Sequence, residues 1–376
     1  MWFNVRQAPS DGERHATWLE LFFDLVFASA VAEVGAGLAR AYDLDSLVAL
    51  GLPFALIWWA WAGHTFFATR FDPDDGGQRL LTGGQVFLVA VMAANVEADL
   101  GGRDIAGFAA AYGVMRLLLA AQYHRVRDPG SRRLTRRYAS GTAIAAVLWL
   151  GSALLPPPLR CGVWLLALAV EILVPLAAER DGRGAPAHPG HLPERFGLFT
   201  LIMLGESVAG LMAGMKQQHT WTPTAAGAAL LSLSLTFLLW WLYFDHLRAA
   251  APRSAGSPSR GRLALWLVAH LPLSLGFVVV AVGLRRLTGA GGAMTDFQQA
   301  SVFWLGALVV ALALAAIARA DWGSESEPGP GRQRPPTALG PEADRSDRDP
   351  GDGGPASATR DRRAWRTLRR RSTFLP

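Results

Sequence analysis

The residues best placed to do chemistry are carboxylates inside long apolar segments. Glu20 and Asp24 lie four residues apart in an aromatic, apolar stretch, so a helix would put both side chains on one face, one turn apart. Glu206 lies near the middle of another apolar segment, beside Ser207. Carboxylates are costly in hydrocarbon and usually face a partner, a hydrated cavity or a transported ion. These residues are therefore predicted to form a pathway for a proton, a small cation or a substrate.

His64 and Asp245 are secondary candidates for the same pathway. His64 follows Trp61 by three residues, so the two side chains would share one helix face. Asp245 lies at the end of an apolar segment, where a solvated charge is the simpler explanation. A single membrane His is more often a packing residue than a ligand, so both interpretations stay open for each residue.

Other charged residues are predicted to form ion pairs or helix caps. Arg116 lies deep in an apolar segment and must be paired there. Its candidate partners are acids in other apolar segments, namely Glu97, Glu171 and Glu206. Glu194 and Arg195 precede the seventh apolar segment, where a helix N-terminus favours an acidic residue.

These residues are carried by apolar segments long enough to cross a membrane. The chain of 376 residues is 51% hydrophobic and only 18% charged, whereas soluble domains have about 25% charged residues. Ten segments of about 20 residues can be drawn: 18–38, 47–69, 80–100, 104–124, 138–155, 161–178, 196–215, 224–244, 263–284 and 300–318. The predicted fold class is all-α, a polytopic transmembrane bundle of about ten helices.

The arginines indicate the orientation of this bundle. They gather in alternate loops, most densely in one loop that carries Arg125, Arg127, Arg132, Arg133, Arg136 and Arg137. Because positive charge is retained on the cytoplasmic side, this loop and both termini are expected in the cytoplasm. The predicted protein is a multi-pass protein of the cell membrane, in contact with the lipid bilayer.

Three regions follow from this composition. Residues 1–17 are predicted to form a cytoplasmic N-terminal segment, without a cleaved signal peptide. Residues 18–320 form the transmembrane helical domain. Residues 321–376 are rich in Arg, Pro and Gly and are predicted to form a disordered cytoplasmic tail.

A weak internal repeat is visible in the apolar region. Glu20 opens the first segment and Glu33 follows within it, as Glu194 opens the seventh and Glu206 follows. The next segment in each case carries a tryptophan pair, Trp58–Trp59 or Trp240–Trp241. The pattern predicts a parallel repeat of helices 1–4 and 7–10, although unequal spacings leave chance as an alternative.

Composition and motifs argue against several other classes of protein. Cys161 is the single cysteine, which excludes an intramolecular disulfide and a cysteine-based metal site. The sequence has no phosphate-binding loop, no HExxH and no GxSxG motif. We therefore expect no enzymatic activity, no cofactor and no metal site. Arginines in loops between apolar runs also argue against a nucleic-acid partner.

Three of these segments resemble the bacterial low temperature requirement A (LtrA) family. They are residues 20–27 (ELFFDLVF), 191–207 (HLPERFGLFTLIMLGES) and 240–245 (WWLYFD), and the likeness covers roughly residues 12–320. The resemblance implies a polytopic protein of the bacterial inner membrane. The family's name records a growth phenotype, so the resemblance implies no substrate. The tail after Trp322 looks atypical of the family.

Two hypotheses of function follow. In the first, the protein is a proton- or cation-coupled transporter or an ion pathway that uses its intramembrane carboxylates. In the second, it is a non-transporting membrane sensor or scaffold, and the buried acids pair with arginine or cap helices. The sequence leaves substrate, coupling direction and oligomeric state open.

Overall fold

The fold is taken from a computed structural model of the chain. The structure describes residues 14–71, 75–100, 106–179, 187–188, 190–216, 222–247, 260–289 and 297–325. The N-terminal residues 1–13 and most of the predicted tail, residues 326–376, lie outside the described residues. The chain divides into two units, Met1–Glu327 and Pro328–Pro376, and all described helices belong to the first.

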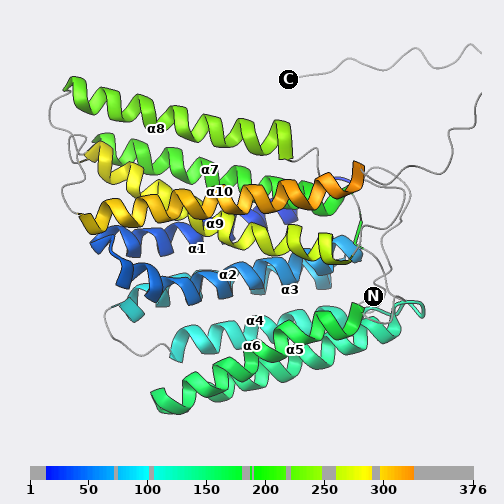
Figure 1. Cartoon of the computed structure of the whole chain (residues 1–376). Coiled ribbons are helices and arrows are strands. Elements are labelled where there is room, and N and C mark those ends of the chain that lie inside the picture. Colours follow the sequence, from blue (N-terminus) through cyan, green and yellow to red (C-terminus); the bar gives the residue numbers. More distant parts are fainter. Residues whose placement is uncertain are drawn as a thin grey trace, which may run out of the picture. The chain divides into compact units, whose positions relative to one another are not determined.

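The regular elements in the described part of the chain are ten α-helices and one short π-helix, and Figure 1 shows how the α-helices are arranged. The first five are α1 (Trp18–Ala41), α2 (Leu44–Arg70), α3 (Gly76–Leu100), α4 (Ala106–Arg125) and α5 (Arg132–Ser152). The others are α6 (Pro157–Glu179), α7 (His191–Lys216), α8 (Pro223–Trp241), η1 (Leu242–Leu247), α9 (Arg260–Gly289) and α10 (Phe297–Glu325). The predicted all-helical class and the number of α-helices are confirmed.

Seven of these helices are long and apolar enough to cross a membrane, judged over the described residues: α1, α2, α3, α7, α8, α9 and α10. Many of their large apolar side chains are exposed, among them Leu230, Leu231, Phe237, Val268 and Trp304. Soluble monomers rarely expose apolar surface on this scale. The exposed side chains therefore mark surfaces that contact lipid.

Several helices extend beyond the apolar segments that predict them. The helix α7 begins at His191, so Glu194 and Arg195 lie inside it, and the expectation that they precede it is wrong. The helix α10 continues to Glu325, through residues that composition assigns to the tail. Polar residues such as Glu and Arg are good helix formers, so helices continue past the hydrocarbon boundary that hydropathy detects.

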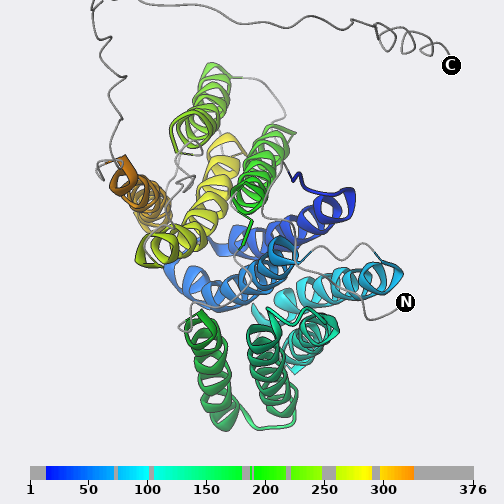
Figure 2. The ribbon, with the colours of Figure 1, turned by 90° about the vertical axis from the view of Figure 1, so that its right-hand side faces the viewer.

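The helices α1 and α2 lie in the middle of the described unit, between α4–α6 on one side and α7, α9 and α10 on the other (Figures 1 and 2). The helix α1 packs against α2, α3, α7 and α9. The helices α4, α5 and α6 form a group of their own, in which α5 contacts both neighbours.

The neighbours of α1–α4 match those of α7–α10. The helix α1 packs against α2 and α3, and α3 packs against α4; likewise α7 packs against α8 and α9, and α9 packs against α10. This correspondence is what a parallel repeat of helices 1–4 and 7–10 would produce. The helices that begin each set, α1 and α7, also contact each other.

The turn between α1 and α2 is fixed by Tyr42. This residue ends α1 in the left-handed conformation, with φ of 54°, which is rare for residues other than glycine. The buried Tyr42 hydroxyl donates a hydrogen bond of 2.8 Å to the backbone oxygen of Val279 in α9. A Cβ atom on Gly283 would clash with this hydroxyl and with the Phe303 ring, so glycine is required there.

Candidate functional site

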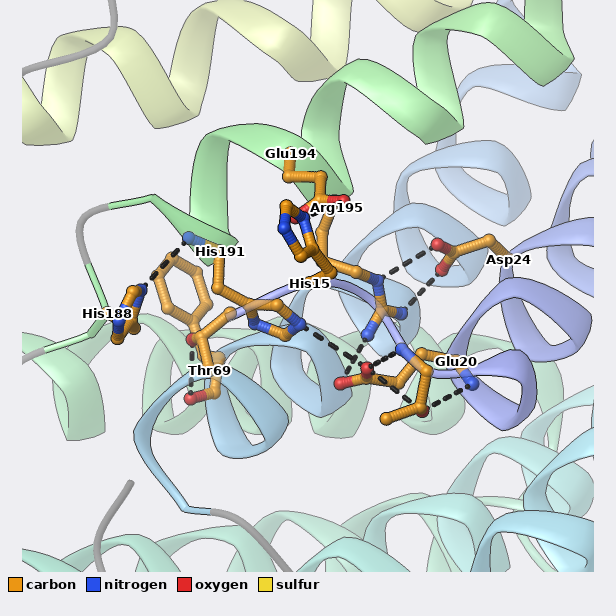
Figure 3. A network of polar contacts seen from close by, with 10 residues as sticks. His15, Glu20, Asp24, Thr69, His188, His191, Glu194 and Arg195 are labelled. Carbon is orange, nitrogen blue, oxygen red and sulfur yellow. Dashed lines mark hydrogen bonds and ion pairs between the residues drawn. The ribbon is translucent and has the colours of Figure 1, made fainter. Parts of the chain in front are cut away.

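The centre of the candidate site is an ion pair between α1 and α7. The Arg195 guanidinium donates two hydrogen bonds to the Asp24 carboxylate, of 2.9 Å from Nε to Oδ2 and 2.6 Å from Nη2 to Oδ1. Both side chains are fully buried, with 0% exposure. Two parallel charge-assisted bonds fix the orientation of the two side chains as well as the distance between them. Figure 3 shows the guanidinium between the two acids of α1.

Glu20 is the second acid of this site. Its Oε1 lies 3.0 Å from Nη1 of Arg195, an ion pair whose angle does not make a well-formed hydrogen bond. Its Oε2 accepts hydrogen bonds from the Thr17 backbone amide at 2.8 Å and from the Thr17 hydroxyl at 3.0 Å. Thr17 in turn accepts from the Glu20 amide, which completes a capping box at the start of α1.

His191, the first residue of α7, contacts the same carboxylate. Its Nε2 lies 3.3 Å from Oε2 of Glu20, while its buried Nδ1 has no hydrogen-bond partner among the described residues. The backbone amide of His191 donates to Nδ1 of His188 at 3.2 Å. The His188 amide donates to the backbone oxygen of Thr69 in α2 at 3.1 Å. This chain of contacts fixes the start of α7 against α1 and α2 (Figure 3).

The second helix contributes an indole to the site. Trp61 donates a hydrogen bond of 2.7 Å from Nε1 to Oδ1 of Asp24. The Trp61 ring stacks on Phe199, with 4.2 Å between ring centroids, and meets Phe196 edge to face at 4.9 Å. The aromatic wall excludes water, so the polar contacts lie in a low-dielectric setting where each is strengthened. We call Glu20, Asp24, Trp61, His191 and Arg195 the α1–α7 cluster.

Glu206 and Ser207 lie away from this cluster. Glu206 is eleven residues beyond Arg195 on α7, or about 16 Å along the helix axis. It is partly exposed and forms no hydrogen bond or ion pair with any described residue. The Ser207 hydroxyl donates to the backbone oxygen of Met203, one turn back, at 3.3 Å. The structure therefore joins two of the three acids singled out by the sequence.

His64 lies beside the α1–α7 cluster, buried within α2. Its ring stacks on Phe23, with 4.0 Å between centroids, and the Gln85 and Gln122 side chains contact it. Its Nδ1 is buried without a hydrogen-bond partner in the described structure. The neighbouring Gly63 allows close approach of Arg116, because a Cβ there would lie 3.0 Å from Nη1 of that arginine.

A row of buried polar side chains runs along α3 from the neighbourhood of His64 to the start of the helix. Gln78, Thr82 and Gln85 are spaced three and four residues apart, so they share one face of the helix. The side-chain amide of Gln78 donates a hydrogen bond of 3.3 Å to the hydroxyl of Thr82. At the helix start, Asp75 accepts two hydrogen bonds from Arg125, of 2.7 and 2.6 Å.

Asp75 lies outside the membrane-spanning segments, immediately before α3. Partial burial opposes ionisation, but hydrogen bonds from Arg125 and the Gln78 backbone amide outweigh it and lower the pKa of this carboxyl. Asp75 is therefore a carboxylate at neutral pH and forms a stable pair with Arg125.

A second buried cluster joins α4, α5 and α6. Arg116 and Glu171 form an ion pair of 2.8 Å, which selects Glu171 from the three partners that the sequence allowed. The same carboxylate accepts hydrogen bonds of 2.8 Å from the Tyr112 hydroxyl and 2.9 Å from the Trp149 indole. In both clusters, therefore, a buried acid is held by one arginine and one tryptophan N–H.

The remaining candidates lie at the ends of helices. Glu194 faces the exposed His15, with 3.5 Å between its Oε1 and Nδ1 of the histidine. Asp245 is exposed within η1. In the same π-helix, the Tyr243 hydroxyl lies 3.0 Å from Nε2 of His270 in α9, a buried contact. Within the described residues, no group of three or more His, Cys, Asp or Glu side chains is placed to hold a metal ion.

Arg195, Trp61 and His191 are the members of the cluster that sequence reasoning did not place there. The sequence predicts an ion pair or a helix cap for Arg195, and the structure shows an ion pair, fully buried against two acids of α1. The internal repeat is the sequence feature that could have indicated the position of Arg195. The two predicted starts of the repeat, at Glu20 and at Glu194, carry the residues that meet between α1 and α7.

Comparison with known proteins supplies a family and one relative. The model of the bacterial low temperature requirement A protein family matches residues 15–328. An uncharacterized protein of Rhizobium meliloti (strain 1021) is 30% identical over 326 residues, which cover 82% of this chain and 75% of the relative. No solved structure matches the chain.

Proposed function

Because the chain belongs to the bacterial low temperature requirement A family of membrane proteins, we propose that it is a proton-coupled transport protein whose proton site is the α1–α7 cluster. The observation that supports this proposal is the unequal charge of the cluster. Two carboxylates, Glu20 and Asp24, surround one permanent cation, Arg195. A further proton, on His191 or on one carboxyl, makes the cluster neutral.

The cost of an uncompensated charge is the physical basis of this proposal. A buried ion without a counter-ion costs several kcal/mol even after the protein relaxes. The Asp24 and Arg195 side chains are fully buried and the Glu20 side chain keeps only 9% exposure, so little water can compensate the second carboxylate. The shared contact between His191 and Glu20, at 3.3 Å, is therefore the natural position of an exchangeable proton.

The position of the cluster supports exchange with water. Glu20 lies in the first turn of α1 and His191 is the first residue of α7, so both are at helix ends. The Glu20 side chain retains 9% exposure, whereas that of His191 has none. By the distribution of arginines this end of the helices faces the cytoplasm, so the proton would exchange with the cytoplasm.

Proton binding at this position would act on the packing of helices. The cluster joins the first helices of the two matching sets, α1 and α7, and Trp61 adds α2. Loss of a proton from His191 would remove a positive charge of α7 that faces Glu20 of α1 and so weaken the attraction between the two helices. Transporters built from repeats move one set of helices against the other, so a charge at this contact could drive such motion.

The proposal is tested in two measurements on the full-length protein. In vesicles that contain a pH-sensitive dye, a potassium diffusion potential should drive proton entry through the wild type. His191→Gln should abolish this entry, while Glu206→Gln, which removes an acid outside the cluster, should leave it unchanged. In detergent, His191→Gln should also take up fewer protons than the wild type in a titration from pH 9 to pH 5.

Two results would overturn the proposal. One is equal proton uptake by wild type and His191→Gln in the titration, because the cluster would then hold no exchangeable proton. The other is proton entry that survives in His191→Gln, because the pathway would then bypass the cluster. His15→Gln serves as a histidine control, since this exposed residue contacts Glu194.

A second candidate function, a non-transporting membrane sensor or scaffold, is favoured by the Arg116–Glu171 pair. Here one acid matches one arginine, and Tyr112 and Trp149 satisfy the remaining carboxylate positions. Such a cluster needs no extra proton and serves packing alone. If wild-type vesicles show no proton entry and the titration finds no exchangeable proton, this structural role extends to the α1–α7 cluster. Neither candidate assigns a catalytic reaction.

A further inference from the structure

A basic pocket lies where α4 ends and α5 begins. Its cavity measures about 400 Å³, and its charged lining consists of His124, Arg127, Arg132 and Arg136. The floor includes Tyr123 and Val126, which are buried. None of the described residues that line it is acidic. The pocket is therefore suited to an anion, and neither the charge balance of the α1–α7 cluster nor the Arg116–Glu171 pair explains it.

We infer that this pocket binds the phosphate headgroup of an anionic phospholipid. Arginine guanidinium groups recognise phosphate oxygens through paired hydrogen bonds, and three arginines line this pocket. Arg132 and Arg136 lie in the first turns of α5, whose N-terminus adds partial positive charge. The inference is independent of any proton pathway.

The pocket lies at the level of phospholipid headgroups. Arg125, the last residue of α4, pairs with Asp75, the residue before α3, and α3 is long and apolar enough to cross a membrane. The pocket begins next to Arg125 and therefore lies near the membrane surface at which α3 begins. Basic pockets between membrane helices on the cytoplasmic side are known binding sites for anionic headgroups.

The lining residues continue into exposed apolar faces of α4 and α5. His124 lies two turns from Leu117 on the same face of α4, and the Leu117 side chain is 38% exposed. Arg136 lies three turns from Val147 on the same face of α5, and the Val147 side chain is 64% exposed. Acyl chains can therefore extend over apolar surface directly from a headgroup in the pocket, which favours a phospholipid over a soluble phosphate.

The chain offers a matched control for testing this site. Arg132 and Arg136 line the pocket, whereas the neighbouring Arg133 and Arg137 are also exposed but do not line it. The variants Arg132→Gln/Arg136→Gln and Arg133→Gln/Arg137→Gln remove the same charge from the same turns of α5. Gel filtration of both variants establishes that they fold as the wild type does.

The experiment measures phospholipid binding to the full-length protein in detergent by native mass spectrometry. Phosphatidylglycerol should bind the wild type more tightly than phosphatidylcholine with the same acyl chains. Each headgroup contact to arginine near the membrane surface is worth about a fivefold change in affinity, so Arg132→Gln/Arg136→Gln should weaken phosphatidylglycerol binding roughly twenty-fivefold. Arg133→Gln/Arg137→Gln should remain within about threefold of the wild type.

Three outcomes would overturn the inference. Equal binding of the two phospholipids would show that the pocket does not select an anionic headgroup. Equal losses in the two double variants would show a general effect of surface charge. Displacement of phosphatidylglycerol by soluble glycerol phosphate at similar concentrations would show that the pocket serves a soluble phosphate compound instead.

Discussion

Arg195 of α7 binds Asp24 of α1 through two hydrogen bonds, although 171 positions separate them in the chain. This pair connects the first helices of the two matching sets. A buried ion pair contributes little net stability compared with apolar residues, but removal of one member leaves an uncompensated charge. The pair therefore makes strong and distinct predictions for single and double variants.

Arg195→Met should lower stability by about 3 kcal/mol or more, because it leaves two buried carboxylates without their cation. Arg195→Met combined with Asp24→Asn should recover part of that loss, since one carboxylate is removed with the arginine. Thermal unfolding of the purified protein in detergent measures both effects. Additive losses in the double variant would contradict a direct energetic coupling between the two side chains.

Trp61→Phe should lower stability by about 1.5 to 3 kcal/mol, because it removes the N–H donor to the charged Asp24 carboxylate. Stacking against Phe199 would be retained by the smaller ring. The control is Trp59→Phe, on the same helix, which has no hydrogen bond to the cluster. Equal unfolding temperatures for the two variants would show that the indole N–H makes no contribution.

Gly283→Ala should strongly destabilise the protein, because the added methyl group would meet the Tyr42 hydroxyl and the Phe303 ring. Overpacking of this kind typically costs about 1 to 3 kcal/mol. Gly51→Ala is the matched control, since nothing lies within 4 Å of a Cβ at that position in α2. The measurement is the unfolding temperature in detergent, and a stable Gly283→Ala protein would argue against this close approach of α9 to the turn.

The Asp75–Arg125 pair should give a stability difference that depends on pH. The pKa of Asp75 is lower in the folded protein than in the unfolded chain, so its ionised form is bound more strongly when folded. The pair's contribution is present above the unfolded pKa, near 4, and disappears as pH falls through the lower folded value. Unfolding temperatures of wild type and Asp75→Asn should therefore differ at pH 7, and the difference should shrink as the pH falls below about 4. A constant difference would contradict this origin.

Hydropathy alone predicts most of the helices, because the bilayer imposes both their length and their composition. It also identifies Glu20 and Asp24 as residues that need a partner. It does not identify the partner, since pairings between distant helices depend on packing that no local pattern encodes. The sequence therefore leaves Arg195 as a member of an ion pair or a helix cap, and it places the start of α7 at Phe196, whereas the helix begins at His191.

The pairing of Arg116 shows the same limit of sequence-based prediction, here for a buried cation that needs an acid. The cost of a buried cation predicts that an acid lies nearby, and three acids satisfied that condition by sequence. Only the packing of α4 against α5, and of α5 against α6, brings Glu171 within 2.8 Å. The π-helix after Trp241 was also missed, because its composition does not differ from that of an ordinary apolar helix end.

The π-helix Leu242–Leu247 contains one residue more than an α-helical segment of the same length would. Deleting a single residue there would restore α-helical geometry and change the direction of the side chains inside the segment. Tyr243 would then lose its register with His270, whose Nε2 it now meets at 3.0 Å. In related chains, a one-residue gap at this position should accompany loss of the tyrosine–histidine contact, so the two changes should be inherited together.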